Sequence, residues 1–386
     1  MDFSGFPNVL FRLVIFGLGL TVVLSTLLSA IRTFVLPRSA PDQIVRGTFV
    51  ITRKFFDLRM RYSTTYEQRD AIMAMYAPLS LLALSFIWLT LVTAGFALMY
   101  TAIGVQPHDA LLLSESAILT LGAAQISGLL QTTMVFGEAS FGLLLTAILI
   151  AYLPTMYAAF STREMLVTLL EVRAGSPPSP ITLFSRLNRL GNLSGLGDIW
   201  RDWEVWFTQL SETHTSLAAL PFFRSPQSHR SWITAAGAIL DSAALTLSLL
   251  DIPYDYRAAL SLRAGFLALR QISDFFGIPY NPDPQPADPI SIFREEFDEL
   301  ADELVANNIP LKADRDQAWK DFSGWRVNYD TTLIALARIV MAPYAPWSSD
   351  RSIRWNRPAL FVRSSRRKIK APKSVPPPSL PTPTKP

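Results

Sequence analysis

Hydrophobic and polar positions divide the chain into an apolar first part and a mixed second part. Three long apolar runs stand before residue 163, and each is long enough for one helix to cross a hydrocarbon core about 30 Å thick. Beyond them, apolar residues recur at every third or fourth position, which is typical of amphipathic helices around a soluble core. The pattern predicts an all-α protein in which transmembrane helices precede an α-helical domain. The apolar runs are residues 13–31, 79–100 and 139–160, and the amphipathic helices are residues 196–220, 232–250, 256–276, 291–308 and 329–342.

The first apolar run has two interpretations, a cleaved signal peptide or a retained transmembrane helix. A signal peptide begins with a basic segment, has a shorter apolar core and ends at a small-x-small cleavage site. This run is uncharged from Leu13 to Ile31, and its apolar character resumes after Arg32. We therefore expect residues 1–36 to hold a retained transmembrane helix.

Basic residues predict how the helices are oriented in the membrane. Residues 37–70 carry many Lys and Arg and more follow Phe160, whereas the connection from 104 to 138 carries none. Basic loops stay on the cytoplasmic side of a membrane. The amino terminus and residues 104–138 are therefore expected outside, and residues 37–70 and 163–386 in the cytoplasm.

The stretch VRGTFVITRKFFDLRMR, residues 45–61, interleaves aromatic and aliphatic residues with basic ones. Such a stretch suits a helix on the inner leaflet, where each basic residue near anionic lipid contributes on the order of 1 kcal/mol to binding. Packing on the cytoplasmic domain is the alternative, and we favour the membrane surface. The basic residues are Arg46, Arg53, Lys54, Arg59 and Arg61.

The connection between the second and third apolar runs is longer than a hairpin needs. Its residues 110–119 predict a helix too short to span a membrane but suited to a re-entrant half-helix, with His108 and Asp109 as its cap. A turn of small and hydroxyl-bearing residues follows at the carboxyl end of that helix, where the helix dipole is negative and favours a cation. The predicted ion-filter residues are Thr120, Leu121, Gly122 and Ala123, and the predicted acids at the pore mouth are Glu115 and Glu138.

A span, a half-helix, a filter-like turn and a second span are together the parts of a pore-loop cation channel. The Thr120 hydroxyl and the carbonyl groups of residues 120–122 are expected to line two ion sites. A ring of Glu115 or Glu138 from several subunits would concentrate cations at the mouth. Short re-entrant segments also occur in proteins that are not channels, and that interpretation stays open.

These parts resemble the potassium-channel superfamily. Residues 76–162 resemble its two-helix pore module, and residues 139–164 resemble the inner helix of a bacterial branch with a long cytoplasmic appendage. Further similarity to that uncharacterised branch lies in LLEVRAGSPPSP (169–180), ETHTSLAALPFFRSPQSHRSWITAAGAILDSAAL (212–245) and APYAPWSSDR (342–351). The resemblance implies a homo-oligomer, a tetramer, that passes a monovalent cation (K⁺ or Na⁺) across the bacterial inner membrane.

The filter departs from the potassium pattern, which is T-V-G-Y-G followed by Asp. Thr120, Leu121 and Gly122 match the Thr, a branched apolar residue and the first Gly, but Ala123 and Ala124 replace the Tyr and the second Gly, and no Asp follows. A glycine able to adopt positive φ and a bracing aromatic ring are therefore both missing. We expect an atypical filter rather than a four-site potassium filter.

Pro154, in the third apolar run, predicts a kink near Ile150 because proline removes one backbone donor and clashes with the carbonyl four residues earlier. A bend in the inner helix opens the cytoplasmic mouth of potassium channels, so Pro154 resembles a gate. Gly142 is expected to pack closely against the half-helix, as small residues do between membrane helices.

Composition limits the remaining chemistry. The chain has no cysteine and only three histidines, far apart, so no disulfide, thiol chemistry or metal site is expected. Glu212, His214 and Asp241 suggest an acid–base or metal group, but their scattered positions on helices favour structural roles. No G-x-S-x-G, Walker or nucleotide-binding pattern occurs, and we expect no enzyme activity, no cofactor and no nucleic-acid partner. Loops at 224–226 and 348–351 remain candidates for ligand binding.

The sequence therefore predicts five segments. Residues 1–36 hold the first transmembrane helix, 37–70 a basic linker, 71–162 the pore-loop module, 163–363 the helical cytoplasmic domain and 364–386 a basic, proline-rich tail that contacts anionic lipid. The expected function is that of an oligomeric cation channel gated or stabilised by its cytoplasmic domain. The alternative is a non-conducting membrane sensor or scaffold that binds a partner through that domain.

Overall fold

The computed structural model describes residues 6–34, 42–123, 125–191 and 193–351. Its elements are α1 (Phe6–Phe34), α2 (Gln43–Met60), α3 (Tyr66–Ala74), α4 (Tyr76–Ala102), α5 (Pro107–Ile118), α6 (Leu129–Ala174), α7 (Pro180–Arg189), η2 (Leu193–Gly195), α8 (Leu196–Ser216), η3 (Leu220–Phe222), α9 (Trp232–Ser248), α10 (Tyr256–Phe276), α11 (Arg294–Ala306), α12 (Arg315–Arg326) and α13 (Asp330–Ile339).

The described residues form helices joined by turns and loops, and their only β feature is an isolated bridge between Leu250 and Leu311. The prediction of an all-α fold is therefore confirmed. The tail predicted at residues 364–386 lies outside the described residues, and so does Ala124 of the predicted filter.

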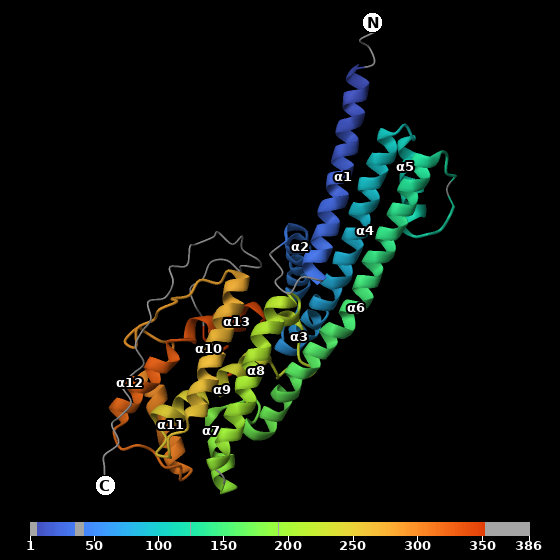
Figure 1. Ribbon diagram of the computed structural model, residues 1–386. Coiled ribbons are helices and arrows are strands. Elements are labelled where there is room, and N and C mark those ends of the chain that lie inside the picture. Colours follow the sequence, from blue (N-terminus) through green and yellow to red (C-terminus); the bar gives the residue numbers. More distant parts are fainter. Residues whose placement is uncertain (1–5, 35–41, 124, 192, 352–386) are drawn as a thin grey trace.

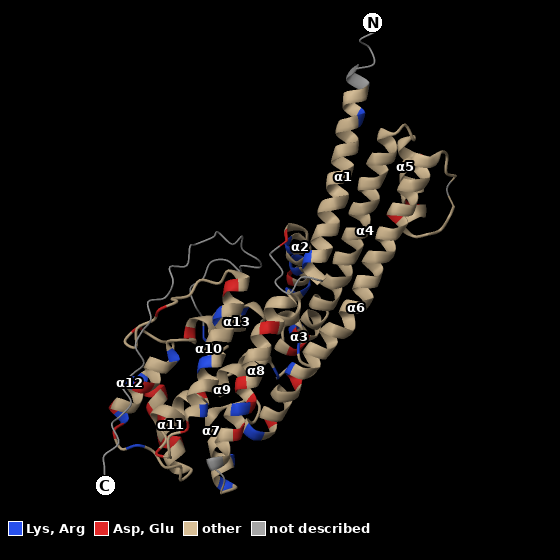
Figure 2. Cartoon of the chain, viewed as in Figure 1, with Lys and Arg blue, Asp and Glu red and all other residues tan. Residues whose placement is uncertain are grey.

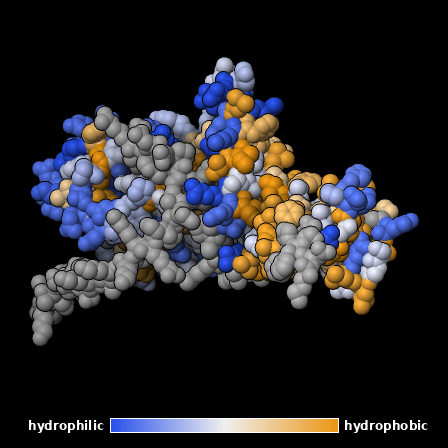
Figure 3. Space-filling view, turned by 90° about the horizontal axis from the view of Figure 1, so that it is seen from above, coloured by the Kyte–Doolittle hydropathy of each residue, from blue (hydrophilic) through white to orange (hydrophobic). Residues whose placement is uncertain are grey.

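Three of the described helical segments are long and apolar enough to cross a membrane. They are Val9–Phe34, Tyr66–Ala102 and Leu129–Ala174. Helices α1, α4 and α6 lie side by side as a bundle (Figure 1), and charged residues are sparse along it and frequent elsewhere (Figure 2). In the view from above, hydrophobic residues gather on the half of the molecule that holds this bundle (Figure 3). The surface of the bundle thus suits a bilayer, whereas the surface of the other half suits water.

Helices α1 and α4 cross at two glycines. A Cβ added to Gly19 would lie 2.4 Å from the carbonyl oxygen of Gly95, and one added to Gly95 would lie 2.7 Å from Cγ2 of Val23. Both distances are far below van der Waals contact, so the two backbones approach this closely only because neither glycine has a side chain. Close crossings at small residues are a common way for helices to pack in a membrane.

Helix α2 begins beside the end of α1. The carboxylate of Asp42 caps it by accepting hydrogen bonds from the backbone N–H groups of Ile44 (3.1 Å) and Val45 (3.3 Å). The same carboxylate accepts a hydrogen bond from the hydroxyl of Ser29 on α1, and that hydroxyl accepts one from the indole of Trp88 on α4 (3.1 Å). The first turn of α2 is therefore tied to two helices of the bundle.

Helix α2 crosses the start of α4 rather than running beside it. Phe49 and Phe56, two turns apart on α2, both meet the ring of Tyr76 edge-on, at centroid distances of 6.1 and 5.8 Å. The Tyr76 hydroxyl also donates a hydrogen bond to the Phe49 carbonyl (3.2 Å). Helix α2 is foreshortened in Figure 1, whereas α4 is seen along its length, so the two helices run in different directions.

Helix α6 connects the bundle to the rest of the molecule. It runs without a break over 46 residues, which is about 69 Å at 1.5 Å per residue. Pro154 lies inside it and does not end it. The predicted segment boundary between residues 162 and 163 therefore falls within one continuous helix.

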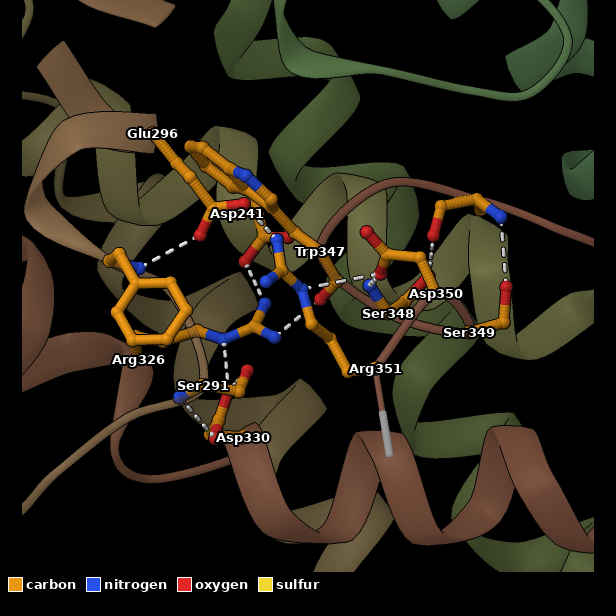
Figure 4. A network of polar contacts seen from close by, with 12 residues as sticks. Asp241, Ser291, Glu296, Arg326, Asp330, Trp347, Ser348, Ser349, Asp350 and Arg351 are labelled. Atoms are coloured by element: carbon orange, nitrogen blue, oxygen red, sulfur yellow. Dashed lines mark hydrogen bonds and ion pairs between the residues drawn. The ribbon is translucent and has the colours of Figure 1, made fainter. Parts of the chain in front are cut away.

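Residues 180–351, from α7 to the end of the described chain, form the helical domain. Helix α9 is its centre, since nearly every side chain from Trp232 to Ser248 is buried. The helix predicted at residues 232–250 is therefore observed, but it is buried on nearly all sides rather than on one face. Its one charged residue, Asp241, accepts a hydrogen bond from the Tyr329 hydroxyl (2.8 Å). It also forms an ion pair with Arg326 (Figure 4).

Arg326 organises a buried network in this domain (Figure 4). Its guanidinium donates to Asp241, to Asp330 (2.8 Å) and to the carbonyl oxygen of Trp347. Burial alone would lower the pKa of Arg326, but the two carboxylates raise it, so the guanidinium stays charged. The loop that follows Trp347 is also tied down, because Arg351 pairs with Glu296. The loop at 348–351 is thus held by structural contacts.

Residues 220–224, here called the junction segment, join the bundle to the helical domain. Arg163 of α6 donates hydrogen bonds to the carbonyl oxygens of Leu220 (3.0 Å) and Phe223 (2.7 Å). The ring of Phe222 contacts Tyr76 of α4 and Phe276 of α10, each at a centroid distance of 5.6 Å. Helices from both parts of the molecule therefore meet on one short segment.

Arg224 completes the junction segment. It donates to the carboxylate of Asp70 on α3 (2.6 Å), to the hydroxyl of Tyr66 (3.2 Å) and to the carbonyl oxygens of Val340 (2.9 Å) and Met341 (2.6 Å), just after α13. These partners occupy the guanidinium of Arg224, so this side chain has a structural role, and ligand binding by the loop at 224–226 stays a prediction.

Candidate ion-conducting segment

Helix α5 is a short helix wedged between α4 and α6. Its 12 residues span about 18 Å, too little to cross a bilayer. Its inner face is buried and includes Ala110, Leu113 and Ala117. The helix begins at Pro107, three residues before the predicted start, because proline suits the first turn, where no backbone N–H needs a partner.

Gly142 of α6 permits the close approach of α5. A Cβ added to Gly142 would lie 2.4 Å from the carbonyl oxygen of Ile118, the last residue of α5. The predicted packing role of Gly142 against the short helix is therefore confirmed.

The turn after α5 folds back on the end of the helix. Thr120 takes the left-handed conformation, with φ of +53°, and its N–H donates to the Ala117 carbonyl (3.0 Å). The N–H of Leu121 donates to the Ser116 carbonyl (2.8 Å), and the N–H of Ala123 to the Ser116 hydroxyl (2.8 Å). The first two bonds form a Schellman cap, in which glycine is usual at the position that Thr120 holds.

The hydrogen bonds of this turn fix the direction of its carbonyl groups. In a trans peptide group the N–H and the C=O point in opposite directions. Since the N–H groups of Thr120, Leu121 and Ala123 point back to α5, the carbonyl oxygens of Leu119, Thr120 and Gly122 point away from it. Gly122 is also left-handed, with φ of +65°, and no atom lies within 4 Å of a Cβ added there.

The four predicted filter residues are all exposed in the single chain. Leu121, a large apolar residue, is 67% exposed. These residues lie together on one turn, as predicted, at the edge of the bundle where the loop between α5 and α6 projects (Figure 1). A single chain cannot surround an ion with one such turn.

A recess of about 740 Å³ opens beside the turn, between the start of α5 and the loop that precedes α6. Leu121 and Ala123 are among the residues that line it, and so are the exposed acids Asp109 and Glu115. Among the described residues that line it there is no Lys or Arg. The two acids therefore give the recess a negative potential that attracts cations. The role of Glu115 at a pore mouth stays a prediction.

Glu138 does not lie at the mouth, where the sequence placed it. Its side chain is completely buried between α4, α5 and α6. One carboxylate oxygen accepts a hydrogen bond from the Tyr100 hydroxyl (3.0 Å), and the other contacts the Ser114 hydroxyl, which lies 2.9 Å from the Thr93 carbonyl oxygen. The prediction of a mouth position is wrong because polar partners on α4 and α5 hold this carboxylate inside one chain.

Four of the five basic residues predicted to lie at the membrane surface are exposed on α2, and the fifth makes contacts within the chain. The side chains of Arg46, Lys54, Arg59 and Arg61 are exposed. Arg53 instead pairs with Asp57 (3.0 Å) and lies over the ring of Tyr76, 5.6 Å from its centroid.

The residues that suggested an enzyme do not converge. His214 is buried beside Arg163 (3.4 Å) and Trp232, whereas Asp241 belongs to the Arg326 network. The described residues contain no group of three or more His, Asp or Glu side chains placed to hold a metal ion.

Two contacts within the bundle were not predicted from the sequence. The Tyr100–Glu138–Ser114 contact joins residues far apart in the chain, but its signal was present, because a carboxylate within a membrane helix usually has a polar partner nearby. The crossing of Gly19 and Gly95 was signalled only by single glycines in two apolar runs, a weak pattern when taken alone.

Comparison of the chain with family models, with curated proteins and with solved structures gave no match. The resemblance to potassium channels therefore stays a prediction from the sequence.

Proposed function

We propose that the protein is an integral membrane protein that assembles with copies of itself and conducts monovalent cations, K⁺ or Na⁺, past the turn that follows α5. The resemblance favours a tetramer in the bacterial inner membrane, with the amino terminus and residues 104–138 outside and the helical domain in the cytoplasm. The observation that carries this proposal is the short helix α5, wedged between two membrane-length helices and ending in an exposed turn whose carbonyl groups point outward.

The electrostatics of the turn favour a cation. The carboxyl end of α5 carries the negative end of the helix dipole. The carbonyl oxygens of Thr120 and Gly122 point away from α5, and in an oligomer they would face those of neighbouring copies. Glu115, on the adjacent recess, would raise the local cation concentration without having to bind the ion itself.

The exposed face of α6 supports self-association. Small residues recur along it every seven positions, and large apolar residues recur with the same spacing, offset by three. This alternation is the spacing at which two helices pack along a shared seam. The small residues are Thr133, Ser140, Ala147, Pro154 and Ser161, and the large ones are Phe136, Leu143, Ile150 and Tyr157. Pro154 lies on this seam, so a bend there would change the distance between copies, as a gate requires.

The proposal is tested by cation flux into liposomes that hold the purified protein. The wild-type protein should give flux that Gly122→Val abolishes, because a β-branched residue cannot adopt the left-handed conformation of Gly122 without strain. Gly191→Val is the matched control, since Gly191 also has positive φ (+67°) and open space around it but lies after α7, in the helical domain.

Flux that Gly122→Val removes and Gly191→Val leaves intact would support the proposal. Absence of wild-type flux with either ion, over a range of voltage and pH, would overturn it. The protein would then be the alternative, a sensor or scaffold that keeps the architecture of a channel.

A further inference from the structure

Helix α2 has a second apolar face that no described residue covers. Its first face, with Val45, Phe49 and Phe56, is buried on the bundle. The second consists of Ile51, Phe55 and Leu58, which are 68%, 63% and 54% exposed. At 100° per residue these three side chains lie within about 60° of arc, so they form one continuous strip.

Two basic residues of α2 flank this strip, and two others do not. By the same helical geometry, Lys54 and Arg59 lie about 70° to either side of the strip's centre, and both are exposed. Arg46 lies about 150° away, on the opposite side of the helix. Arg53 is taken up by its contacts with Asp57 and Tyr76. Positive charge that is free to meet a ligand therefore stands on both edges of the strip.

The strip lies where a membrane surface would be. The cap of α2 is tied to Ser29, near the end of α1, and Phe49 and Phe56 contact Tyr76, the first residue of α4. Both anchors stand at the same end of the bundle, where apolar spans give way to charged residues (Figure 2). Because α2 and α4 run in different directions there, the length of α2 would run along the leaflet.

We propose that α2 is a lipid-binding element: Ile51, Phe55 and Leu58 insert among the acyl chains of the inner leaflet, and Lys54 and Arg59 bind the phosphates of anionic lipids. An apolar strip between two cationic edges is the pattern of helices that lie in the interface of an anionic membrane. The basic carboxyl-terminal segment is a poor occupant for this strip, because residues 352–386 contain Lys and Arg but no acidic residue. The inference needs the bundle to be in a membrane, but it does not depend on ion conduction.

The absence of cysteine allows a clean labelling test. Single cysteines at Ile51, Phe55, Leu58 and Arg46 in the full chain would each carry an environment-sensitive fluorophore. The protein would be placed in nanodiscs that contain brominated acyl chains, with either zwitterionic phosphatidylcholine or a mixture rich in phosphatidylglycerol. We expect quenching at 51, 55 and 58 but little at 46, and deeper quenching in the anionic discs.

A second test distinguishes binding of anionic headgroups by Lys54 and Arg59 from insertion of the apolar strip alone. Retention of fluorescent phosphatidylglycerol would be compared among the wild type, the double variant Lys54→Gln/Arg59→Gln, and Arg46→Gln. The last variant is the control, because it removes a positive charge from the opposite side of α2. Each basic residue that meets anionic lipid should change the apparent affinity on the order of five-fold, so the double variant should lose ten-fold or more while Arg46→Gln stays close to wild type.

Equal quenching at all four positions, or equal loss with Arg46→Gln, would overturn the proposal. Labels at 51, 55 and 58 that are shielded from water but not quenched by brominated lipid would also overturn it, and would assign the strip to contact between copies. Flux in the same preparations is read separately, so the failure of conduction and the failure of lipid binding are distinguishable.

Discussion

Glu138 is buried among three helices, and its hydrogen bonds decide what a substitution there does. The Ser114 hydroxyl has one hydrogen but contacts two oxygens, those of Glu138 and of the Thr93 carbonyl. A donor at position 138 would satisfy all of these groups, because it could donate to Ser114 and free the Ser114 hydrogen for Thr93. Glutamine offers such a donor and keeps an acceptor for Tyr100.

We therefore expect Glu138→Gln to change the free energy of unfolding by less than about 1 kcal/mol, and Glu138→Leu to lower it by about 1–3 kcal/mol, because leucine leaves buried hydroxyls unpaired. Unfolding of the detergent-solubilised protein, with hydrogen exchange of α5 as a local probe, measures both. If glutamine proves as damaging as leucine, the negative charge itself is needed and the hydrogen-bond account is wrong.

His214 is expected to make the stability of the folded protein depend on pH. It is completely buried, and burial together with the charge of Arg163 lowers its pKa well below the usual value. The imidazole is neutral in the folded protein, while in the unfolded chain it takes up a proton near pH 6.5. Stability is therefore fully present above about pH 6.5 and falls with decreasing pH, by up to roughly 1.4 kcal/mol per pH unit from this one group.

Replacing His214 by Gln should flatten the dependence of unfolding free energy on pH between about 6.5 and 5, whatever it does to stability at neutral pH. Chemical unfolding of the solubilised protein at several pH values measures the slope. His108→Gln, which removes an exposed histidine from α5, is the control. An unchanged slope in His214→Gln would contradict the assignment.

At the scale of elements, the contact between α1 and α4 depends on Gly19. Gly19→Val would drive a side chain into the Gly95 carbonyl, whereas Gly17→Val, two residues earlier on the same helix, meets no atom within 4 Å. We expect Gly19→Val to cost about 1–3 kcal/mol through overpacking and Gly17→Val to be nearly neutral. Parallel thermal unfolding measures both, and equal effects would show that helix propensity rather than the crossing controls stability here.

The helices differ in how far the sequence could predict them. Helix α10 is observed at the predicted residues 256–276 because Asp255 caps its start and Gly277, in the left-handed conformation, ends it. The apolar runs located α1, α4 and α6 but gave bounds that were too short, since hydropathy marks the membrane core and helices continue past it. Helix α6, for example, extends from Leu129 to Ala174 rather than from 139 to 160.

The candidate site was predictable only in part. The short helix and the turn at Thr120 follow from local signals of length, polarity and capping. The burial of Glu138 does not, because it depends on Tyr100 and Ser114, and single-sequence patterns carry no information about which distant residues meet. The division of the basic residues of α2 escaped prediction for the same reason, since Arg53 turns inward only because Tyr76 lies there.

At the scale of the whole molecule, the junction segment is the route by which the helical domain and the bundle influence each other. Arg224 reaches α3, beside the bundle, and the end of α13, in the helical domain. Asp70 and Arg224 are both nearly buried, with side chains 13% and 10% exposed. Removing one partner of such a pair costs about 3–5 kcal/mol because the other charge is left unpaired.

Arg224→Gln should therefore loosen the junction while leaving each part folded. We expect faster hydrogen exchange in α3 and in residues 340–343, with little change in α10 and α12, which are held by other contacts. Adding Asp70→Asn should recover part of the lost stability, because it removes the unpaired carboxylate, and this recovery distinguishes an ion-pair effect from a packing defect. Arg257→Gln is the control, because the side chain of Arg257, paired with Asp255, is 40% exposed. Faster exchange throughout the helical domain would instead mean that Arg224 stabilises that domain as a whole and does not specifically couple it to the bundle.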